Sequence, residues 1–509
     1  MLEKKHLLLL LSVLLFMNKN KCLDSVDIQI DDQLVTKNVY NQLVTEQETY
    51  QKIGYRKPKN KQDNQNGFNA TDPGQLDRTF GTEGRVISTN FEGVLTGIAI
   101  RQTTAGDYEI VTTGASTDRT PLNAMLLLTT YNRDGNQIAK VDFSSTTPPA
   151  FGTAIAIDSE NRIVIGGNVG INVNLGRQLR FMARRYINPT TLDTSFNPPT
   201  GTAYASLPTI DILSLALAID TQNRILLAGG VFTDNGNFQL VKFTNSGQLD
   251  SSFGGPNATN PGFSSGGFPL PNKNTIKGIA LQENGAIIVS GQSGERFVLA
   301  RYSANGVFDT TWPTGPNGGI VTDFTPLGLV NRGARSNAVA LQKDGKIVAV
   351  GTTATNVTGT GQAFVLARYN PNGTLDTTFG SGGLQVAPFN SAISEATAVA
   401  IDANGFIIVA GLTTPTGTSQ ECFALAVFNP DGSLNNEFGN NGLVVTAFGN
   451  NGAGASSVAI EPISKKIIVG GNTNQHFALA CYNGIVEKQA PLPVARFSSN
   501  GTLDPRFGK

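Results

Sequence analysis

Short apolar runs alternate with glycine-rich turns along most of the chain. Typical runs are Lys-Ile-Val-Ala-Val at residues 346–350 and Phe-Val-Leu-Ala-Arg-Tyr at residues 364–369. Runs of this kind, rich in β-branched and aromatic residues and bounded by turn residues, are typical of β-strands. The pattern therefore predicts an all-β chain built from hairpins. Three of the pairs that separate neighbouring runs favour tight type I′ turns: Asn284-Gly285, Asp344-Gly345 and Asn404-Gly405.

One segment of 14 residues occurs seven times with a period near 60 residues; in the copy at 338–351 it reads Ala-Val-Ala-Leu-Gln-Lys-Asp-Gly-Lys-Ile-Val-Ala-Val-Gly. The third position of every copy is Ala, and successive copies are 57, 62, 62, 60, 60 and 59 residues apart. Each period carries four strand-like runs, which is the signature of a β-propeller. We predict seven four-stranded antiparallel blades, with the small-residue strand innermost. The repeated alanines are Ala99, Ala156, Ala218, Ala280, Ala340, Ala400 and Ala459.

A turn motif indicates how the ring closes. The motif Leu-Asp-Thr-Thr-Phe-Gly at residues 375–380 has a relative at 76–81, ahead of the first small-residue strand, and another at 503–508. A strand at residues 85–91 can therefore join the last blade from outside, which leaves no open sheet edge in the ring. The alternative is an open β-solenoid, although short rungs and atypical capping repeats are not obvious here. We predict that the propeller occupies residues 75–509.

The N-terminal residues predict export. Lys4 and Lys5 precede an apolar run at residues 7–17, and such a helix would span only ~16 Å of a bilayer core that is ~30 Å thick. We predict a signal peptide at residues 1–22 and a periplasmic, extracellular or cell-surface location. An uncleaved interfacial anchor is the alternative. Residues 23–74 are rich in Gln, Asn, Lys and Asp, which predicts a solvated leader or, alternatively, a tether.

Charge and cysteine content narrow the range of partners. The chain has 38 basic and 38 acidic residues, and only 15% of its residues are charged. Nucleic-acid binding needs a basic excess, so we expect no nucleic-acid partner. The three cysteines are Cys22, Cys422 and Cys481. The last two occupy different positions on equivalent strands, about 16 Å apart, so we expect buried thiols and no disulfide.

The runs at residues 338–351 and 364–380 resemble the delta-60 repeat family of β-propellers, a group of bacterial, mostly secreted proteins of undefined function. The resemblance covers about residues 75–509, and it implies a propeller with a non-enzymatic, surface or extracellular role. It supplies no catalytic residues. The first repeat has lost the turn motif, because Asp134-Gly135 is followed by the segment Ile138 to Phe143. In the last repeat, an insertion at residues 485–492 separates two copies of the third strand, so the pairing there stays open.

Residue types that carry chemistry are scarce. His476 is the one histidine beyond the predicted signal peptide, and no cluster has the spacing of metal ligands. The single tryptophan, Trp312, replaces Phe in the turn motif. We expect no catalytic residue, metal or cofactor. The repeated aspartates of the motif could form a ring of metal ligands, but capping of their own turns is the preferred interpretation: Asp77, Asp193, Asp250, Asp309, Asp376 and Asp504.

One candidate binding site emerges at the mouth of the predicted channel, where the innermost strands begin. Aligning these strands places Lys277, Arg335 and Glu395 in three consecutive blades near one rim. We hypothesise a small polar site for an anionic or zwitterionic group; the alternative is a surface ion pair of little energetic worth. The aligned ring of strand starts is otherwise neutral: Thr96, Thr153, Leu215, Asn337, Thr397 and Ser456.

These features favour an exported, monomeric, non-enzymatic scaffold that binds an unidentified protein, small molecule or glycan. A hydrolase or lyase with carboxylates at the channel is one alternative, although only Glu395 stands there. A structural or adhesive surface protein is another. Fold alone does not decide among them, because propellers host unrelated activities.

Overall fold

The computed structural model describes residues 71–485, apart from 104–106, 117–124, 143–149, 174–175, 208–211, 232–237, 256–258, 267, 269–273, 313–318 and 360. The predicted signal peptide, most of the predicted leader and the C-terminal turn motif lie outside the described residues. Within the described part, no helix is both long and apolar enough to span a bilayer.

The strands follow the sequence repeats. Before the first repeat stands β1 (Arg85–Ile87). The first three repeats contain β2 (Gly93–Gln102), β3 (Tyr108–Ser116), β4 (Leu126–Asn132) and β5 (Gln137–Asp142); β6 (Ala150–Ile157), β7 (Ile163–Val173), β8 (Gly176–Asn188), β9 (Thr191–Leu192) and β10 (Thr202–Ala205); and β11 (Ile212–Ile219), β12 (Ile225–Val231), β13 (Phe238–Phe243) and β14 (Phe263–Gly266).

The later repeats contain β15 (Asn274–Leu281), β16 (Ile287–Ser293), β17 (Arg296–Tyr302) and β18 (Ile320–Thr322); β19 (Val330–Leu341), β20 (Ile347–Ala354), β21 (Gln362–Tyr369) and β22 (Leu384–Ala387); β23 (Ser391–Ile401), β24 (Ile407–Pro415), β25 (Cys422–Phe428) and β26 (Leu443–Thr446); and β27 (Ala453–Ile460), β28 (Ile467–Thr473) and β29 (His476–Tyr482). Two short helical turns, η3 (Asn197–Gly201) and η4 (Thr325–Leu327), lie between strands.

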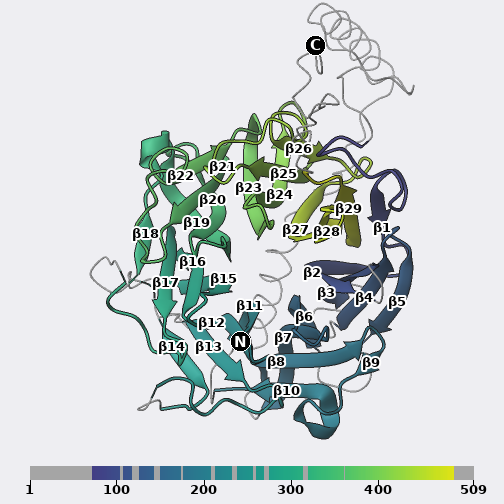
Figure 1. Ribbon diagram of the computed structural model, residues 1–509, viewed down its shortest axis with the longest axis vertical. Helices are drawn as coiled ribbons and strands as arrows, with labels where there is room; N and C mark the ends of the chain where they lie inside the picture. The colour runs from purple at the N-terminus through teal and green to yellow at the C-terminus, as the bar shows by residue number, and fades with distance from the viewer. Residues whose placement is uncertain are drawn as a thin grey trace, which may run out of the picture.

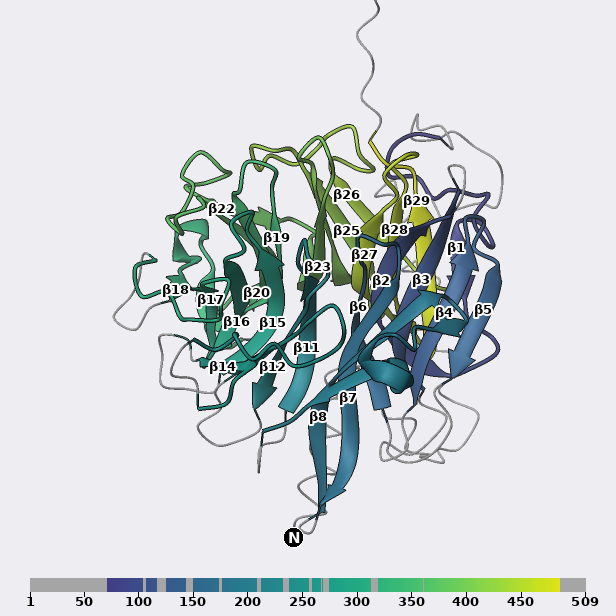
Figure 2. The same ribbon diagram turned by 60° about the horizontal axis from the view of Figure 1, so that its bottom comes forward.

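The repeats stand around a central opening, with the first strand of each repeat nearest to it (Figure 1). The following strands pair outward in antiparallel order, as in the sheet β15-β16-β17-β18. Apolar side chains of neighbouring repeats pack between the sheets; for example, Phe423 and Ala478 share one core cluster. The hairpin β7–β8 projects beyond one face of the ring (Figure 2). The predicted all-β propeller with the small-residue strands innermost is therefore confirmed.

The predicted number of blades is wrong. Five separate blades are present, as sheets of four or five strands, and the remaining strands β19–β26 form one continuous eight-stranded sheet. Its antiparallel halves are joined by a parallel bridge between Gln362 of β21 and Ile393 of β23. The bridge lies near the start of β23, which begins at Ser391, ahead of the small-residue segment at Ala398. A sequence period counts repeats, but it does not show whether neighbouring repeats share hydrogen bonds.

The turns that follow the inner strands also differ from the prediction. In the pair Asn284-Gly285, Gly285 has a φ of 81°, whereas Asn284 is not among the residues with positive φ. The Gly285 N–H donates to the carbonyl of Gln282, and the Gln282 N–H donates to the carbonyl of Ala286. A type I turn followed by a left-handed glycine has this pattern, so the loop is one residue longer than the predicted type I′ turn.

An outer strand from before the first repeat closes the ring, as predicted. Strand β1 pairs antiparallel with β29, with Arg85 opposite Ala480 and Ile87 opposite Ala478. The turn motif ahead of β1 takes the place that the other motifs occupy in their own repeats: the Asp77 N–H donates to the carbonyl of Cys481. Of the two third-strand copies in the last repeat, the first therefore completes the sheet.

Every inner strand carries a β-bulge at the same position, and polar side chains at several bulges hydrogen-bond to the next repeat. Thr397 donates to the carbonyl of Ala455 at 2.8 Å, and Ser456 donates to that of Leu95 at 2.7 Å. Each of these carbonyls belongs to the residue just before the next bulge, so the bulges connect neighbouring repeats near the axis. The bulge residues are the aligned ring of strand starts: Thr96, Thr153, Leu215, Lys277, Asn337, Thr397 and Ser456.

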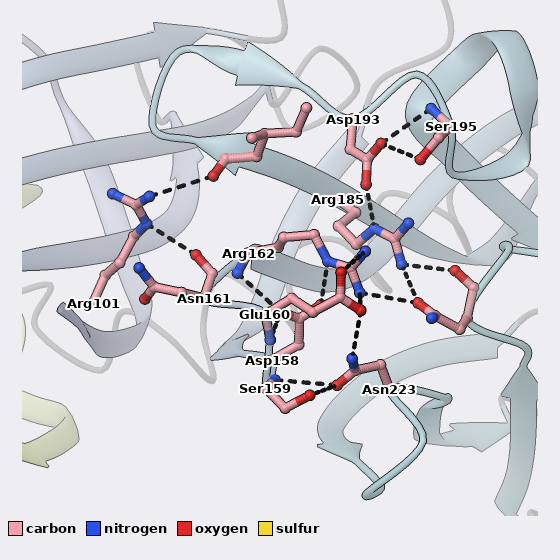
Figure 3. Close-up of polar contacts among 12 residues, drawn as sticks. Arg101, Asp158, Ser159, Glu160, Asn161, Arg162, Arg185, Asp193, Ser195 and Asn223 are labelled. Carbon is pink, nitrogen blue, oxygen red and sulfur yellow. Dashed lines mark hydrogen bonds and ion pairs between the residues drawn. The ribbon is translucent and has the colours of Figure 1, made fainter. Parts of the chain in front are cut away.

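Farther out, a second set of contacts connects the repeats. In one example, Arg368 of β21 pairs with Asp376 of its own turn motif at 2.8 Å, lies 4.5 Å from the ring centre of Phe379, and donates to the carbonyl of Pro430 in the next repeat. We call this arrangement the Arg–Asp latch. The other arginine latches are centred on Arg301, and on Arg185 with Asp193 (Figure 3). Lys242 makes the same inter-repeat contact, to the carbonyl of Ala304.

The latch is absent where its basic residue is replaced. The equivalent position in β25 is Val427, and there the motif carries Asn435 in place of aspartate. Asn435 instead donates to Asn429 at 2.9 Å. In the closing sheet the position is Cys481, and Asp77 pairs with Lys466 from the start of β28. Among these repeats, the motif therefore has aspartate where a basic side chain lies close enough to pair with it, and asparagine where none does.

Replacing Arg368 with Met should lower the free energy of unfolding by about 2 kcal/mol, because buried Asp376 would lose one of its two cations and keep only Lys346. Chemical denaturation at neutral pH measures this change. Arg332→Met is the matched control; Arg332 is exposed, so a change within about 0.5 kcal/mol is expected. The double change Arg368→Val and Asp376→Asn copies Val427 and Asn435 and should recover part of the loss. A double variant no more stable than Arg368→Met would contradict this account.

Candidate functional site

The structure brings the three predicted site residues together. Lys277 stands at the bulge of β15, Arg335 on β19 and Glu395 on β23. A guanidinium nitrogen of Arg335 lies 2.7 Å from a carboxylate oxygen of Glu395. The Lys277 ammonium donates to the amide oxygen of Asn337 at 3.0 Å. Groups from three neighbouring inner strands therefore meet in one polar cluster beside the channel.

Asn337 is the central residue of this cluster. Its amide nitrogen donates to Glu395 at 3.1 Å and to the carbonyl of Ala396 at 2.7 Å, while its oxygen accepts from Lys277. The sequence alignment placed Asn337 in the ring of strand starts but did not select it as a site residue. Its residue type could have identified it from the sequence. An amide is the only side chain in that ring that can donate through one atom and accept through another.

The cluster is more buried than a surface ion pair. The side chains of Arg335 and Glu395 are only 11% and 13% exposed. The buried Nε–H of Arg335 has no hydrogen-bond partner among the described residues. A donor left in this state costs about 1–3 kcal/mol, and such unmet groups in folded proteins call for a specific explanation. The pair is therefore not an exposed surface ion pair.

The repeated aspartates cap their own turns, as predicted. Asp376 accepts hydrogen bonds from the backbone N–H and the hydroxyl of Thr378, at 3.2 and 2.7 Å. The equivalent pairs are Asp77 with Thr79, Asp193 with Ser195, Asp250 with Ser252 and Asp309 with Thr311. Asp504 lies outside the described residues. Within the described ranges, no group of three or more His, Cys, Asp or Glu residues could hold a metal ion.

Other residue types with chemical capacity serve the fold. His476 Nδ1 lies 3.1 Å from the carbonyl oxygen of Phe91, so this nitrogen carries the hydrogen. Trp312 is buried beneath Arg301 and offers no exposed platform. Cys422 and Cys481 are buried and unbridged, as predicted. Burial raises the pKa of the Cys481 thiol to about 12, so it is protonated at neutral pH.

Comparison with known families agrees with the fold. Segments 223–253, 282–311, 342–379 and 403–438 match a family described as "Domain of unknown function (DUF5122) beta-propeller". The match supports the expected β-propeller domain of unknown function. It does not confirm the delta-60 repeat resemblance. No protein with a curated description matches the chain.

Solved structures give only distant likenesses. An ulvan lyase of polysaccharide lyase family PL25 is 11% identical, with 79% of this chain and 96% of that chain covered and a TM-score of 0.46. An ulvan lyase of that family bound to -[GlcA(1-4)Rha3S]- has the same identity and coverage and a TM-score of 0.45. The Dos1 propeller is 8% identical, with 79% and 94% covered and a TM-score of 0.40. Likenesses at this level carry no conclusion about chemistry.

Acid should weaken the fold through Asp376. Burial alone would raise the pKa of this carboxyl, but the hydrogen bonds from Thr378 and Lys346 and the charge of Arg368 lower it to about 2. A carboxyl with a lowered folded-state pKa stabilises the protein above its unfolded pKa of about 3.9, and this contribution disappears as the pH falls from about 4 to 2. We expect Asp376 to account for about 2 kcal/mol of the free energy of unfolding that is lost in this window.

Chemical denaturation at several pH values between 7 and 2 measures this effect, with Asp376→Asn as the comparison. The variant should be less stable at pH 7 and should lose less stability than the parent between about pH 4 and 2. Parallel pH profiles for the two proteins would contradict the assignment.

Proposed function

We propose that this protein is an exported, non-enzymatic binding scaffold that holds an anionic or zwitterionic group at the mouth of its channel. The observation that carries the proposal is the cluster in which Lys277, Arg335 and Glu395 meet around Asn337. Such a cluster can offer cationic donors to an oxyanion while Glu395 orients Arg335 and Asn337 orients Lys277.

The position of the cluster supports binding rather than a purely structural role. At three other bulges, the ring residue is a Thr or Ser that donates to a backbone carbonyl of the next repeat. A hydroxyl is sufficient for that contact. Lys277 and Asn337 replace hydroxyls in adjacent repeats, and Arg335 and Glu395 add two further charges next to them. Burying charged groups is costly, so the fold alone does not favour this replacement.

Binding should depend on the charges of the cluster. Acetate, inorganic phosphate, sulfate and glycine are suitable probes, because they represent carboxylate, doubly charged oxyanion and zwitterionic ligands. We expect at least one of them to bind in isothermal titration calorimetry. The triple change Lys277→Ala, Arg335→Ala and Glu395→Ala should weaken that binding at least about tenfold, a loss of about 1.4 kcal/mol.

Lys343→Ala is the control for charge, because Lys343 is exposed and lies beyond the other end of β19. It should leave the affinity unchanged. Unchanged affinity in the triple variant would place the ligand elsewhere, and binding of none of the probes would overturn the proposed ligand chemistry.

Export is tested by fractionation and N-terminal sequencing of the protein from its host. We expect a mature N-terminus between about Lys21 and Val26, with the protein in the periplasm or the medium, because the apolar run at residues 7–17 of the predicted signal peptide is too short to span a bilayer. An intact Met1 in the membrane fraction would instead make residues 1–74 an anchor and tether.

A further inference from the structure

A second polar site lies where the inner strand β6 ends. The channel-mouth cluster, by contrast, lies toward the beginnings of the inner strands β15, β19 and β23. The turn between β6 and β7, strand β8 and the turn after β13 of the next repeat enclose an open hollow of about 510 Å³. It is lined by Glu160, Arg162, Arg185 and Ser195 of one repeat and by residues 244–246 of the next. Figure 3 shows Glu160, Arg162 and Arg185 of the second repeat close together, with dashed lines marking their polar contacts.

The two arginines hold Asn245 in one orientation. Its amide oxygen accepts from Arg162 at 3.0 Å and from Arg185 at 2.7 Å, which directs its amide nitrogen away from both guanidinium groups. Arg185 is itself held by Asp193 at 2.6 Å and by the ring of Phe196. Its side chain is only 3% exposed, and its Nη2 makes no hydrogen bond to any residue that the structure describes. Arg185 and Asn245 both line the hollow, and each keeps one donor that these contacts leave unused.

Glu160 supplies an acceptor beside them. One of its carboxylate oxygens accepts from Arg162 and from the amide of Asn223, both at 3.0 Å, and the other lies 3.0 Å from a second nitrogen of Arg162. These contacts fix the orientation of the carboxylate, and because the side chain is 55% exposed, its oxygens can still accept a further hydrogen bond from a ligand. A molecule in the hollow would accept hydrogen bonds from Arg185 and Asn245 and donate one to Glu160.

This arrangement is a departure from the repeat pattern. The residue equivalent to Asn245 is Ala304, Pro371 or Pro430 in the repeats that follow. None of these side chains can accept from an arginine, and in those repeats only the backbone carbonyl of the position receives the latch contact. The latch alone therefore does not require an amide side chain at position 245.

The charge around the hollow decides what class of ligand fits. Arg162 and Arg185 face three carboxylates, those of Asp158, Glu160 and Asp193, with which they form ion pairs. The set carries one more negative than positive charge, so a free anion gains no net attraction here. Neighbouring hydroxyl groups can donate and accept at once, which matches two fixed donors beside a fixed acceptor.

We propose that this hollow binds a neutral sugar residue through adjacent hydroxyl groups, with Arg185 and Asn245 as donors and Glu160 as acceptor. The site is separate from the channel mouth, and it goes beyond the function proposed for that cluster. Because the hollow is open and polar, we expect weak binding, with a Kd of about 1 mM for a single sugar unit.

Saturation-transfer NMR on the full exported chain tests the proposal, with the neutral methyl glycosides of glucose, galactose, mannose and xylose as probes and sulfate as competitor. We expect at least one glycoside to bind and sulfate not to displace it. Asn245→Pro should weaken binding at least about tenfold. This variant should fold, because Pro371 and Pro430 occupy the equivalent position in turns with the same backbone hydrogen bonds.

Ala304→Pro is the matched control, since it makes the same change in the next repeat, and it should leave binding and thermal stability as they are. Glu160→Gln should weaken binding less than Asn245→Pro, because the amide oxygen still accepts a hydrogen bond. Three results would each overturn the proposal: no glycoside binds, sulfate displaces the glycoside, or Asn245→Pro binds as the parent does. None of these results bears on the channel-mouth cluster, whose test uses charged probes and different residues.

Discussion

The inner strands converge on one axis, and the space between neighbouring repeats is smallest there. A Cβ atom added to Gly278 would come within 2.9 Å of the backbone nitrogen of Val339 in the next repeat, and one added to Gly152 would meet the Thr113 hydroxyl at 2.2 Å. Only small residues fit, so apolar burial cannot by itself bind the repeats together near the axis. Hydrogen bonds from the bulge residues to the next repeat take over this role, and they depend on the bulges to aim the side chains.

Away from the axis the repeats diverge, and larger side chains fill the wider space. Aromatic rings such as Phe379 pack under the arginine of each latch, and the latch connects its own turn motif to the next repeat. A buried ion pair of this kind adds little net stability, yet a displaced partner leaves a charge unpaired. The latches therefore disfavour any packing of two neighbouring repeats in which the arginine and its aspartate are out of register. Around the closure, where Cys481 and Val427 replace the basic residue, Asp77 and Asn435 are provided with other partners.

Both proposed sites lie where one repeat departs from the others. At the channel mouth, Lys277 and Asn337 stand where four of the other five repeats have a hydroxyl side chain, and at the hollow Asn245 stands where two later repeats have proline. Features common to all repeats, such as the capping aspartates, are explained by turn geometry and inter-repeat contacts. In a propeller made of near-equivalent units, the shared residues mainly build the ring, and the exceptions are where ligand chemistry can reside.

The sequence by itself determined the all-β repeat architecture, the small inner strands, the capping role of the aspartates and the closure by β1, because each depends on local pattern or on the order of elements. It also placed Lys277, Arg335 and Glu395 near one rim, because aligning the repeats shows which residues occupy equivalent positions on the inner strands. Only the tertiary structure decided that β19–β26 form one sheet, that Asn337 joins the rim residues, and that Arg185 meets Asn245 of the next repeat. These outcomes depend on contacts between repeats, and the distance and angle between two packed repeats are not encoded in the spacing of residues within either one.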